Sequence, residues 1–256
     1  MTTQSALAAA FRALHVKTDP LILFNIWDAG SAATVAASGA KALATGSWPV
    51  AAAFGYADGE NIPLSLALNN ISRIIAGTDL PVSMDLEGGY GAAPADVANT
   101  VTQAVKTGIV GFNFEDQIIG ADGLYGTDTQ AARIAAARKA ADAECAGIYI
   151  NARTDIFLKA KPDTHNDAML GDAIARAKAY QAAGADGFFA PGLADTALIK
   201  TLCAAVDMPV NIIALPHVPD AATLAALGVA RISHGPVPYK KMSAWLEEQA
   251  RAVFEG

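Results

Sequence analysis

The stretch Leu80-Pro-Val-Ser-Met-Asp85-Leu-Glu87-Gly-Gly-Tyr-Gly91 joins an apolar run to a glycine-rich turn through two carboxylates. A short apolar run bounded by turn residues is typical of a buried strand, and side chains two residues apart on a strand face the same side. The glycines would let the backbone turn sharply and approach a ligand closely. The stretch therefore predicts a strand that ends in a polar site, as in a parallel α/β fold.

Four glycines share one position in the sequence pattern. Gly39, Gly108, Gly184 and Gly228 each follow an alanine-rich helical segment and precede an apolar run. Glycine is favoured just past a helix end because it adopts the left-handed conformation without a steric penalty. The pattern therefore predicts repeated helix-to-strand loops, which are the mark of an alternating fold.

Eight apolar runs are predicted to be strands, with alanine-rich segments between most of them. They are Ile22–Asp28, Ala42–Gly46, Val82–Glu87, Gly111–Asp116, Gly147–Asp155, Gly187–Gly192, Val210–Leu215 and Arg231–His234. Asp79-Leu-Pro-Val82 returns as Asp207-Met-Pro-Val210 after 128 residues (207 − 79), which is half of the 256-residue chain. Four βα units are half of a (β/α)8 barrel, so this TIM barrel is favoured over a doubly wound open sheet. No linker or charge block divides the chain, and residues 1–256 are predicted to form one domain.

The composition excludes several classes of partner. With 18 basic and 25 acidic residues, the net charge of −7 gives no electrostatic reason to expect a nucleic acid or an anionic membrane. No apolar run is long enough to span a bilayer. The segment from Ser5 to Leu14 has no basic leader and shows helical spacing, so the expected compartment is the cytoplasm.

Polar residues gather at the carboxyl ends of the predicted strands. They are Asp28, Thr45, Asp85, Glu87, Glu115, Arg153, Asp155, Asn211 and His234. In a barrel these ends share one rim, which carries the active site. The acidic pair Glu115-Asp116 ends a run next to the one that ends in Asp85, so acids from two strands are expected to converge. Hard oxygen ligands of this kind suit Mg²⁺, with Mn²⁺ as the alternative.

Several motifs together resemble one superfamily. They are Asn25-Ile-Trp-Asp-Ala-Gly-Ser31, Ala42-Leu-Ala-Thr-Gly-Ser47, Gly55-Tyr-Ala-Asp58-Gly, Asp85-Leu-Glu-Gly-Gly-Tyr-Gly91, Phe114-Glu-Asp-Gln117 and Asn151-Ala-Arg-Thr-Asp155. In this order the chain resembles the isocitrate lyase and phosphoenolpyruvate mutase superfamily from about Leu23 to its final helix. The resemblance implies a Mg²⁺-dependent barrel enzyme that acts on 2-oxo acids through an enolate. It also implies a homo-oligomer, a dimer of dimers, in which paired subunits exchange a helix over Tyr239–Glu255.

The resemblance implies an acidic metal site. Asp85 resembles the residue closest to the metal, and Glu87 and Glu115 resemble residues that hold it partly through water. Asp58 resembles the acid at the mouth of the site that orients metal-bound water or substrate. A 2-oxo acid can chelate Mg²⁺ through a carboxylate oxygen and its keto oxygen, so the metal would stabilise charge as an enolate forms.

The resemblance also implies substrate contacts. Arg153 resembles the arginine that binds the developing oxyanion and the substrate carboxylate, and a guanidinium group suits either oxygen. Its alternative role is a structural ion pair with Asp155 or a neighbouring carboxylate. The backbone amides of Ser47 and Trp48 correspond to those that grip the substrate carboxylate in this superfamily, and Asn211 resembles a further polar residue of the substrate site.

One loop departs from the family pattern. Isocitrate and methylisocitrate lyases carry a lysine, a cysteine and a histidine after the fourth strand, whereas Ile118–Asp128 contains none of these. Cys145 and Cys203 are predicted to be buried thiols at the opposite end of the barrel. The lysine and the asparagine-serine pair of the phosphonate-forming mutases are also missing. Asp122, Tyr125 and Asp128 are candidates for protonating the enolate, with water as the alternative.

These observations leave three functions open. The first is a Mg²⁺-dependent carbon-carbon lyase or decarboxylase that acts on an oxaloacetate-like 2-oxo acid or a related hydroxy acid. The second is a phosphoenolpyruvate or phosphonopyruvate mutase or hydrolase of the same superfamily. The third is a non-catalytic barrel that binds a 2-oxo acid, and it is motivated by the missing loop residues. For the first function, decarboxylation and retro-aldol-type cleavage of a small substrate both fit the sequence, because they need an electron sink but little else. The loss of CO₂ requires no general base.

Overall fold

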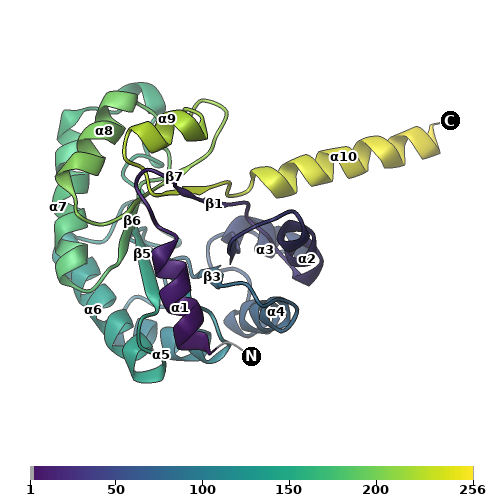
Figure 1. Ribbon diagram of the computed structural model, residues 1–256, viewed down its shortest axis with the longest axis horizontal. Coiled ribbons are helices and arrows are strands. Elements are labelled where there is room, and N and C mark those ends of the chain that lie inside the picture. The colour runs from purple at the N-terminus through teal and green to yellow at the C-terminus, as the bar shows by residue number, and fades with distance from the viewer. Residues whose placement is uncertain (1–2, 256) are drawn as a thin grey trace.

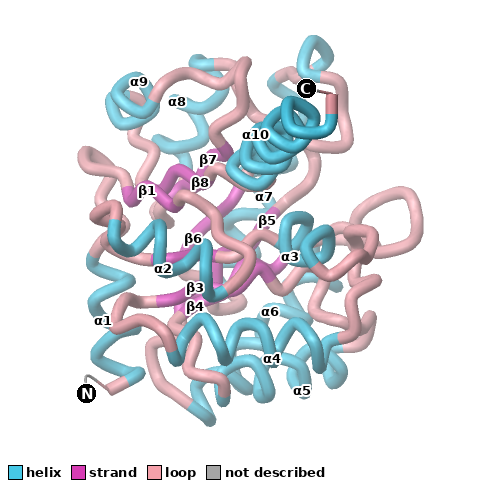
Figure 2. Tube along the Cα trace, turned by 90° about the vertical axis from the view of Figure 1, so that its right-hand side faces the viewer, coloured by secondary structure: helices cyan, strands magenta, loops and turns pink. Residues whose placement is uncertain are grey.

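The computed structural model describes residues 3–255 and has a core of short parallel strands surrounded by helices (Figures 1 and 2). The strands are β1 (Leu21–Leu23), β2 (Leu43–Ala44), β3 (Val82–Asp85), β4 (Gly111–Glu115), β5 (Tyr149–Arg153), β6 (Gly187–Phe189), β7 (Val210–Ile213) and β8 (Arg231–Ser233). The helices are α1 (Gln4–Ala13), α2 (Ala29–Ala37), α3 (Ser47–Ala53), α4 (Leu64–Ala76), α5 (Pro94–Lys106), α6 (Thr127–Glu144), α7 (Asp167–Ala182), α8 (Thr196–Ala205), α9 (Ala221–Ala226) and α10 (Val237–Phe254), with a 3₁₀ turn, η1, at Pro162–Thr164.

The strands form a nearly closed (β/α)8 barrel. Their order is β1-β8-β7-β6-β5-β4-β3-β2, and neighbouring strands are parallel. The two ends of the sheet meet at a single parallel bridge between Ile26 and Thr45. There the Ile26 amide donates to the Ala44 carbonyl oxygen at 3.0 Å. The predicted barrel fold is therefore confirmed.

The sequence signals of the alternating fold have the predicted geometry. Gly39, Gly108, Gly184 and Gly228 lie between a helix and a strand, with φ values of +93°, +104°, +104° and +94°. This left-handed region is strained for residues with a side chain, which explains the choice of glycine. The repeated Asp-x-Pro-Val motif enters β3 and β7, and these strands are four units apart in the barrel.

The strands are shorter than predicted, and one polar residue has a different role. The first strand was expected over Ile22–Asp28 but spans Leu21–Leu23. Asp28 is the N-cap of α2, where its Oδ1 accepts from the Ser31 amide at 2.7 Å and the Ser31 hydroxyl accepts from the Asp28 amide at 3.0 Å. This capping box competes with strand extension because it fixes the start of the helix.

The apolar core has an inner and an outer part. Inside the amino end of the barrel, Phe11 of α1 packs with Leu21, Leu23 and Tyr149. Burial of a residue such as Phe11 contributes about 1.5–3 kcal/mol and closes this end of the barrel. The larger cluster lies between the strands and the surrounding helices. The barrel is thus filled at its amino end, which leaves the carboxyl end for a site.

The two cysteines lie toward the amino ends of the strands, as expected. Cys203 on α8 is buried, and burial raises the pKa of its thiol to about 11. The prediction of a buried thiol is wrong for Cys145, which is only partly buried. Cys145 follows the last residue of α6, where the chain turns toward β5 on the outside of the barrel.

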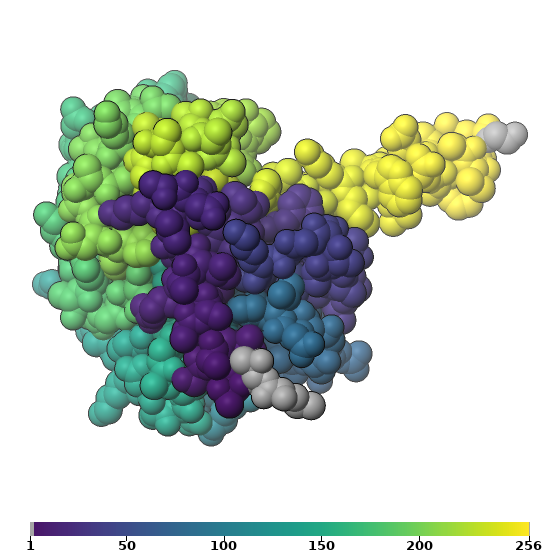
Figure 3. Space-filling model, viewed as in Figure 1, coloured from purple at the N-terminus to yellow at the C-terminus, as the bar shows by residue number. Residues whose placement is uncertain are grey.

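The final helix projects away from the body of the protein (Figures 1 and 3). Pro238 is the only buried residue of α10, and the side chains of Trp245, Leu246 and Phe254 are exposed. None of the helices within residues 3–255 is long and apolar enough to cross a membrane.

Candidate active site

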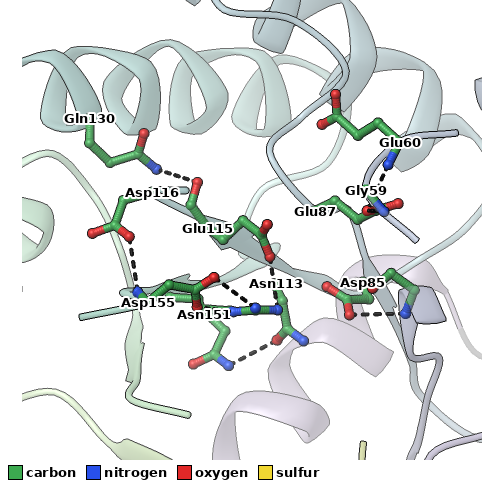
Figure 4. Close-up of polar contacts among 12 residues, drawn as sticks. Gly59, Glu60, Asp85, Glu87, Asn113, Glu115, Asp116, Gln130, Asn151 and Asp155 are labelled. Carbon is green, nitrogen blue, oxygen red and sulfur yellow. Dashed lines mark hydrogen bonds and ion pairs between the residues drawn. The ribbon is translucent and has the colours of Figure 1, made fainter. Parts of the chain in front are cut away.

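Strand alternation gathers polar side chains inside the carboxyl end of the barrel. In the register of β4 and β5, Asn113 lies beside Asn151 and Glu115 lies beside Arg153. Residues two apart share a face, so both pairs point into the barrel. Figure 4 shows Asp85, Glu87 and Glu115 at the ends of β3 and β4.

A pocket of about 220 Å³ opens at this end of the barrel. Five of the eight site residues predicted from the sequence line it: Ser47, Trp48, Asp58, Asp85 and Arg153. Of the other three, Glu87 and Glu115 are buried next to these residues. Asn211 is also buried, and its side chain exchanges hydrogen bonds of 3.1 Å with the hydroxyl of Ser233, which does line the pocket. A direct contact of Asn211 with substrate stays a prediction.

Asp85 is held by the neighbouring strand and helix. Its Oδ2 accepts from the Ser47 amide at 3.0 Å, and its own amide donates to the Thr45 hydroxyl at 3.0 Å. Its Oδ1 is buried without a hydrogen-bond partner in the described residues. A buried carboxylate oxygen without a partner is costly, so this atom fits a cation or a water molecule.

Glu87 is held by a loop from the other side. Its Oε2 accepts from the amides of Gly59 and Glu60 at 2.9 and 2.8 Å (Figure 4). Burial and the charge of Asp85 raise the pKa of Glu87 to about 8. Its backbone is left-handed, with φ of +51°, a strained conformation of the kind that clusters at functional sites.

The glycines after Glu87 serve packing between protein segments. A Cβ at Gly88, Gly89 or Gly91 would lie 2.9 Å from Ile119, 2.9 Å from Phe114 or 2.3 Å from Asp96. None of the three glycines lines the 220 Å³ pocket. The sequence reasoning expected them to approach a ligand, whereas the structure places them against other side chains.

Arg153 forms the structural ion pairs that were predicted as its alternative role, and it also lines the pocket. Its guanidinium binds both carboxylate oxygens of Asp155, at 2.5 and 2.9 Å, and Glu115 Oε2 at 2.8 Å. Burial lowers the pKa of Arg153, but these carboxylates outweigh burial and raise it. Conversely, burial raises the pKa of Glu115, and Arg153 opposes that shift. Three of its five N–H groups are used in these contacts, which leaves two for a ligand.

Asp116 does not converge with the other acids. Its Oδ2 accepts from Arg176 at 3.1 Å and from the Tyr180 hydroxyl at 2.8 Å, and its Oδ1 accepts from the Asp155 amide at 3.0 Å. Adjacent residues on a strand point to opposite faces, so Glu115 faces the pocket and Asp116 faces α7. The sequence prediction that both acids of this pair reach the site is wrong for Asp116.

Sequence reasoning missed a buried polar layer beneath the pocket. Asn113 lines the pocket, and its Oδ1 accepts from Asn151 at 2.9 Å and from Arg231 at 3.0 Å. Burial lowers the pKa of Arg231 to about 10, and the charges of Tyr149 and Asp85 oppose that shift. Polar residues spaced by two along the fourth and fifth strands were the available signal.

The loop after β4 lies outside the pocket. Asp122, Tyr125 and Asp128 are absent from the pocket lining. The Tyr125 amide donates to the Asp116 carbonyl oxygen at 2.8 Å, and the Arg133 guanidinium lies 4.1 Å from the Tyr125 ring centre. Tyr125 is therefore held against the outer wall in this conformation, so its role as a proton donor stays a prediction.

The charges of the site are compatible with a divalent cation. Five carboxylates gather here, namely Asp58, Asp85, Glu87, Glu115 and Asp155, against the guanidinium groups of Arg153 and Arg231. Burial and the charge of Asp85 raise the pKa of Asp58 as well. No set of three or more His, Cys, Asp and Glu side chains within residues 3–255 is arranged to hold a metal by itself. This is compatible with Asp85 as a direct ligand and with water in the remaining positions.

Comparison with known proteins identifies the family. The family model described as phosphoenolpyruvate phosphomutase matches residues 11–254. The chain belongs to the phosphoenolpyruvate mutase family. Its structure is similar to a crystal structure from Burkholderia cenocepacia J2315, provisionally described as a phosphonomutase, with a TM-score of 0.93, 49% identity and coverage of 99% of this chain and 100% of that chain.

Two relatives of this phosphoenolpyruvate mutase family member align with most of its chain. Uncharacterized protein Rv1998c of Mycobacterium tuberculosis (strain ATCC 25618 / H37Rv) is 34% identical over 96% of this chain and 90% of its own length. An oxaloacetate decarboxylase of Chromohalobacter salexigens is 30% identical over 93% of this chain and 82% of its own length. The family contains lyases and mutases, which supports an enzyme.

Proposed function

We propose that this protein is a Mg²⁺-dependent carbon-carbon lyase that decarboxylates an oxaloacetate-like 2-oxo acid, or cleaves a related hydroxy acid, through a pyruvate-type enolate. The observation that carries the proposal is that Asp85, whose Oδ1 has no hydrogen-bond partner in the described residues, and Arg153 line the same pocket. A site for a cation thus lies beside a guanidinium group. These are the two groups needed to bind a 2-oxo acid and stabilise the charge of its enolate.

Asp85 would hold the metal, with Glu87 and Glu115 acting partly through water. When bound there, Mg²⁺ or Mn²⁺ would supply positive charge that stabilises a developing enolate. Asp58 would orient water or substrate at the mouth of the pocket. Two N–H groups of Arg153 are available to donate to the substrate carboxylate or to the enolate oxygen.

The amide of Ser47 is already bonded to Asp85, so its contribution would be to fix that carboxylate. The Trp48 amide lies in the first turn of α3 and would donate to the substrate carboxylate. In the decarboxylation of oxaloacetate, the C3–C4 bond breaks, its electron pair enters the enolate and CO₂ leaves. Water then protonates C3, which requires no acid from the loop after β4.

A mutase or hydrolase is the second candidate, because the structure with 49% identity is provisionally described as a phosphonomutase. The pocket lining offers Arg153 as its only cationic side chain within the described residues, which favours a 2-oxo acid over a phosphonate. A non-catalytic barrel is the third candidate.

The test of this function is a turnover screen with purified protein. Oxaloacetate, phosphonopyruvate and a panel of small hydroxy acids would be incubated with Mg²⁺, and the release of pyruvate, CO₂ and phosphate would be followed. Metal-dependent release of pyruvate and CO₂ without phosphate is the expected result. Binding of oxalate with Mg²⁺ but no turnover would favour the non-catalytic barrel, and phosphate release would favour a hydrolase.

We also propose that the protein is a homo-oligomer that exchanges α10. In a (β/α)8 barrel the helix after the eighth strand normally covers the first and last strands. Here α10 projects outward, and the outward-facing Ile22 and Phe24 of the β1 region remain 42% and 47% exposed along a groove of about 530 Å³. The α10 of a second copy would cover that groove with its exposed Trp245 and Leu246.

Light scattering on size-exclusion fractions tests the exchange. Trp245→Glu places a charge in the interface, so the oligomer is expected to dissociate at micromolar concentration. Glu248→Gln, on the same exposed helix, is the matched control and should leave the assembly intact. A wild-type protein that elutes as a monomer would contradict the proposal.

A further inference from the structure

One wall of the active-site pocket is apolar. The acidic side chains of the lining are Asp58, from the loop after α3, and Asp85 of β3, whereas the side of the pocket formed by β6, β7 and the loops after them presents Phe189, Pro191, Ile213 and Leu215. Phe189 of β6 lies in register with Arg153 of β5, and Ile213 lies on the same face of β7, two residues beyond Asn211, which is the register partner of Phe189. The pocket therefore has an acidic half and an apolar half.

The apolar half offers no counter-ion for a second anionic group. Arg153 is the only Arg, Lys or His among the described residues that line the pocket, and its charge is shared with Glu115 and Asp155. Lys240 does not line the pocket, and its Nζ lies 4.8 Å from the ring centre of Trp48. The Arg153 guanidinium lies 5.9 Å from the Phe189 ring centre, so the side of the pocket without a counter-ion is that of Ile213 and Leu215. A permanently charged group against Ile213 and Leu215 would lose its hydration without gaining an ion pair, which is unfavourable.

The same wall would bind an apolar group well. Each methylene group that moves from water to an apolar surface strengthens binding by roughly fourfold. Ligand pockets commonly combine an apolar wall with a few polar groups that fix orientation. In this pocket the charged groups Asp85 and Arg153 lie on β3 and β5, so the head of the ligand and its apolar part would point in opposite directions.

We infer that the substrate is a 2-oxo acid with an apolar substituent on carbon 3, and that this substituent packs against Phe189, Ile213 and Leu215. The inference rests on the proposed function, because the 2-oxo acid head must bind beside Asp85 and Arg153. The substrate class is that of the 3-alkyl-substituted oxaloacetates, in which the C4 carboxylate would lie toward Arg153 and the alkyl group toward the apolar side. Loss of CO₂ from 3-propyloxaloacetate breaks the C3–C4 bond, leaves its electron pair in the enolate and gives 2-oxohexanoate after water protonates C3.

Binding of N-substituted oxamates tests the inference without turnover. Oxamate mimics the 2-oxo acid head, and an N-alkyl group extends from the position of carbon 3. Calorimetry with Mg²⁺ would compare oxamate, N-methyl-, N-ethyl- and N-propyloxamate with N-oxalylglycine, which carries a carboxylate on that side. The affinity is expected to rise about fourfold per methylene group and to be weaker for N-oxalylglycine than for N-propyloxamate.

The possible outcomes separate this inference from the function on which it rests. If oxamate binds with Mg²⁺ but N-oxalylglycine binds as tightly as N-propyloxamate, the apolar substituent is wrong and the 2-oxo acid function stands. If neither oxamate nor its N-alkyl derivatives bind, both this inference and the proposed 2-oxo acid function are wrong. A higher kcat/KM for 3-propyloxaloacetate than for oxaloacetate, corrected for spontaneous decarboxylation, would support the inference, and a lower value would overturn it.

A substitution that changes the preference between an apolar and a charged ligand provides the second test. Leu215 lies in the loop after β7 and is only partly buried, so Leu215→Lys should fold. It places a cation on the apolar side, and the preference between N-propyloxamate and N-oxalylglycine is expected to shift at least tenfold toward the latter. Leu66→Lys, on the exposed face of α4, is the matched control and should keep the wild-type preference. An unchanged preference in Leu215→Lys would overturn the placement of the substituent.

Discussion

The two halves of the pocket are built by the same alternation of side chains but are stabilised differently. On β3–β5 the inward positions carry charges that need partners, so Glu115, Arg153 and Asp155 form a buried ion-paired group. On β6 the position in register with Arg153 carries Phe189, and on β7 the pocket is lined by Ile213, two residues beyond Asn211; both apolar side chains need only to exclude water. We therefore expect the acidic half to respond to metal and pH, and the apolar half to set the preference among ligands.

Removal of the Asp85 carboxylate should have the largest effect. Among residues 3–255, Asp85 is the one acid with a buried oxygen that lacks a hydrogen-bond partner, so metal-dependent turnover is expected to fall by about a thousandfold or more in Asp85→Ala. Calorimetry should show no Mg²⁺ binding, while circular dichroism shows a folded barrel. Asp79→Ala, just before the same strand at the amino end, is the matched control. Retained turnover in Asp85→Ala would remove this residue from the metal site.

Loss of the Arg153 charge should destabilise the acidic half. Arg153→Met leaves Glu115 and Asp155 buried without their partner, and breaking a buried ion pair in this way costs about 3–5 kcal/mol in the free energy of unfolding. Urea unfolding without metal would measure it. Arg12→Met removes a half-exposed partner of Asp186 and should cost about 0–1 kcal/mol. Equal losses in the two variants would contradict the contrast.

The fold was more accessible to sequence reasoning than the site. The helix-end glycines and the repeated Asp-x-Pro-Val motif report local backbone geometry, so they located the βα units correctly. Asp85 and Arg153 could be placed on the rim because a charged residue at the end of an apolar run is conspicuous. The apolar wall could not be recognised from the sequence. Phe189 and Ile213 belong to near-continuous apolar strands, in which residues that line a pocket look like residues of the core.

Contacts between distant segments explain the remaining misses. In the sequence Asp116 looks equivalent to Glu115, but strand alternation turns the Asp116 side chain toward α7. The buried contact between Arg231 and Asn113 joins residues 118 positions apart, and no local pattern connects them. Strand lengths were overestimated because caps such as Asp28 start the next helix early.

The stability of the metal-free protein should decrease as the pH rises. The pKa of Glu87 is raised from 4.5 to about 8, so the folded state holds a proton that the unfolded state loses above pH 4.5. The free energy of unfolding should therefore fall as the pH increases from about 4.5 to about 8. Chemical denaturation across this range would measure the fall, and Glu87→Gln should flatten it.

Metal binding should show the opposite dependence on pH. Mg²⁺ must displace the Glu87 proton, so its affinity should rise by up to about tenfold per pH unit below pH 8. Calorimetry in buffers of different ionisation enthalpy would count the released protons, and at least one is expected at pH 6.5. Binding without proton release would show that Glu87 is not coupled to the cation.

The smallest expected effect concerns a single methylene group on the apolar half. Ile213→Val removes contact area from the proposed wall, so the affinity for N-propyloxamate should fall by up to about fourfold while that for oxamate is unchanged. Ile212, the adjacent residue on β7, is fully buried on the opposite face. Ile212→Val should lower the free energy of unfolding by about 0.5–1.5 kcal/mol without changing the ratio of the two affinities. If both variants changed that ratio equally, strand packing rather than contact with the substituent would set the preference, and the division of the pocket into two halves would lose its functional meaning.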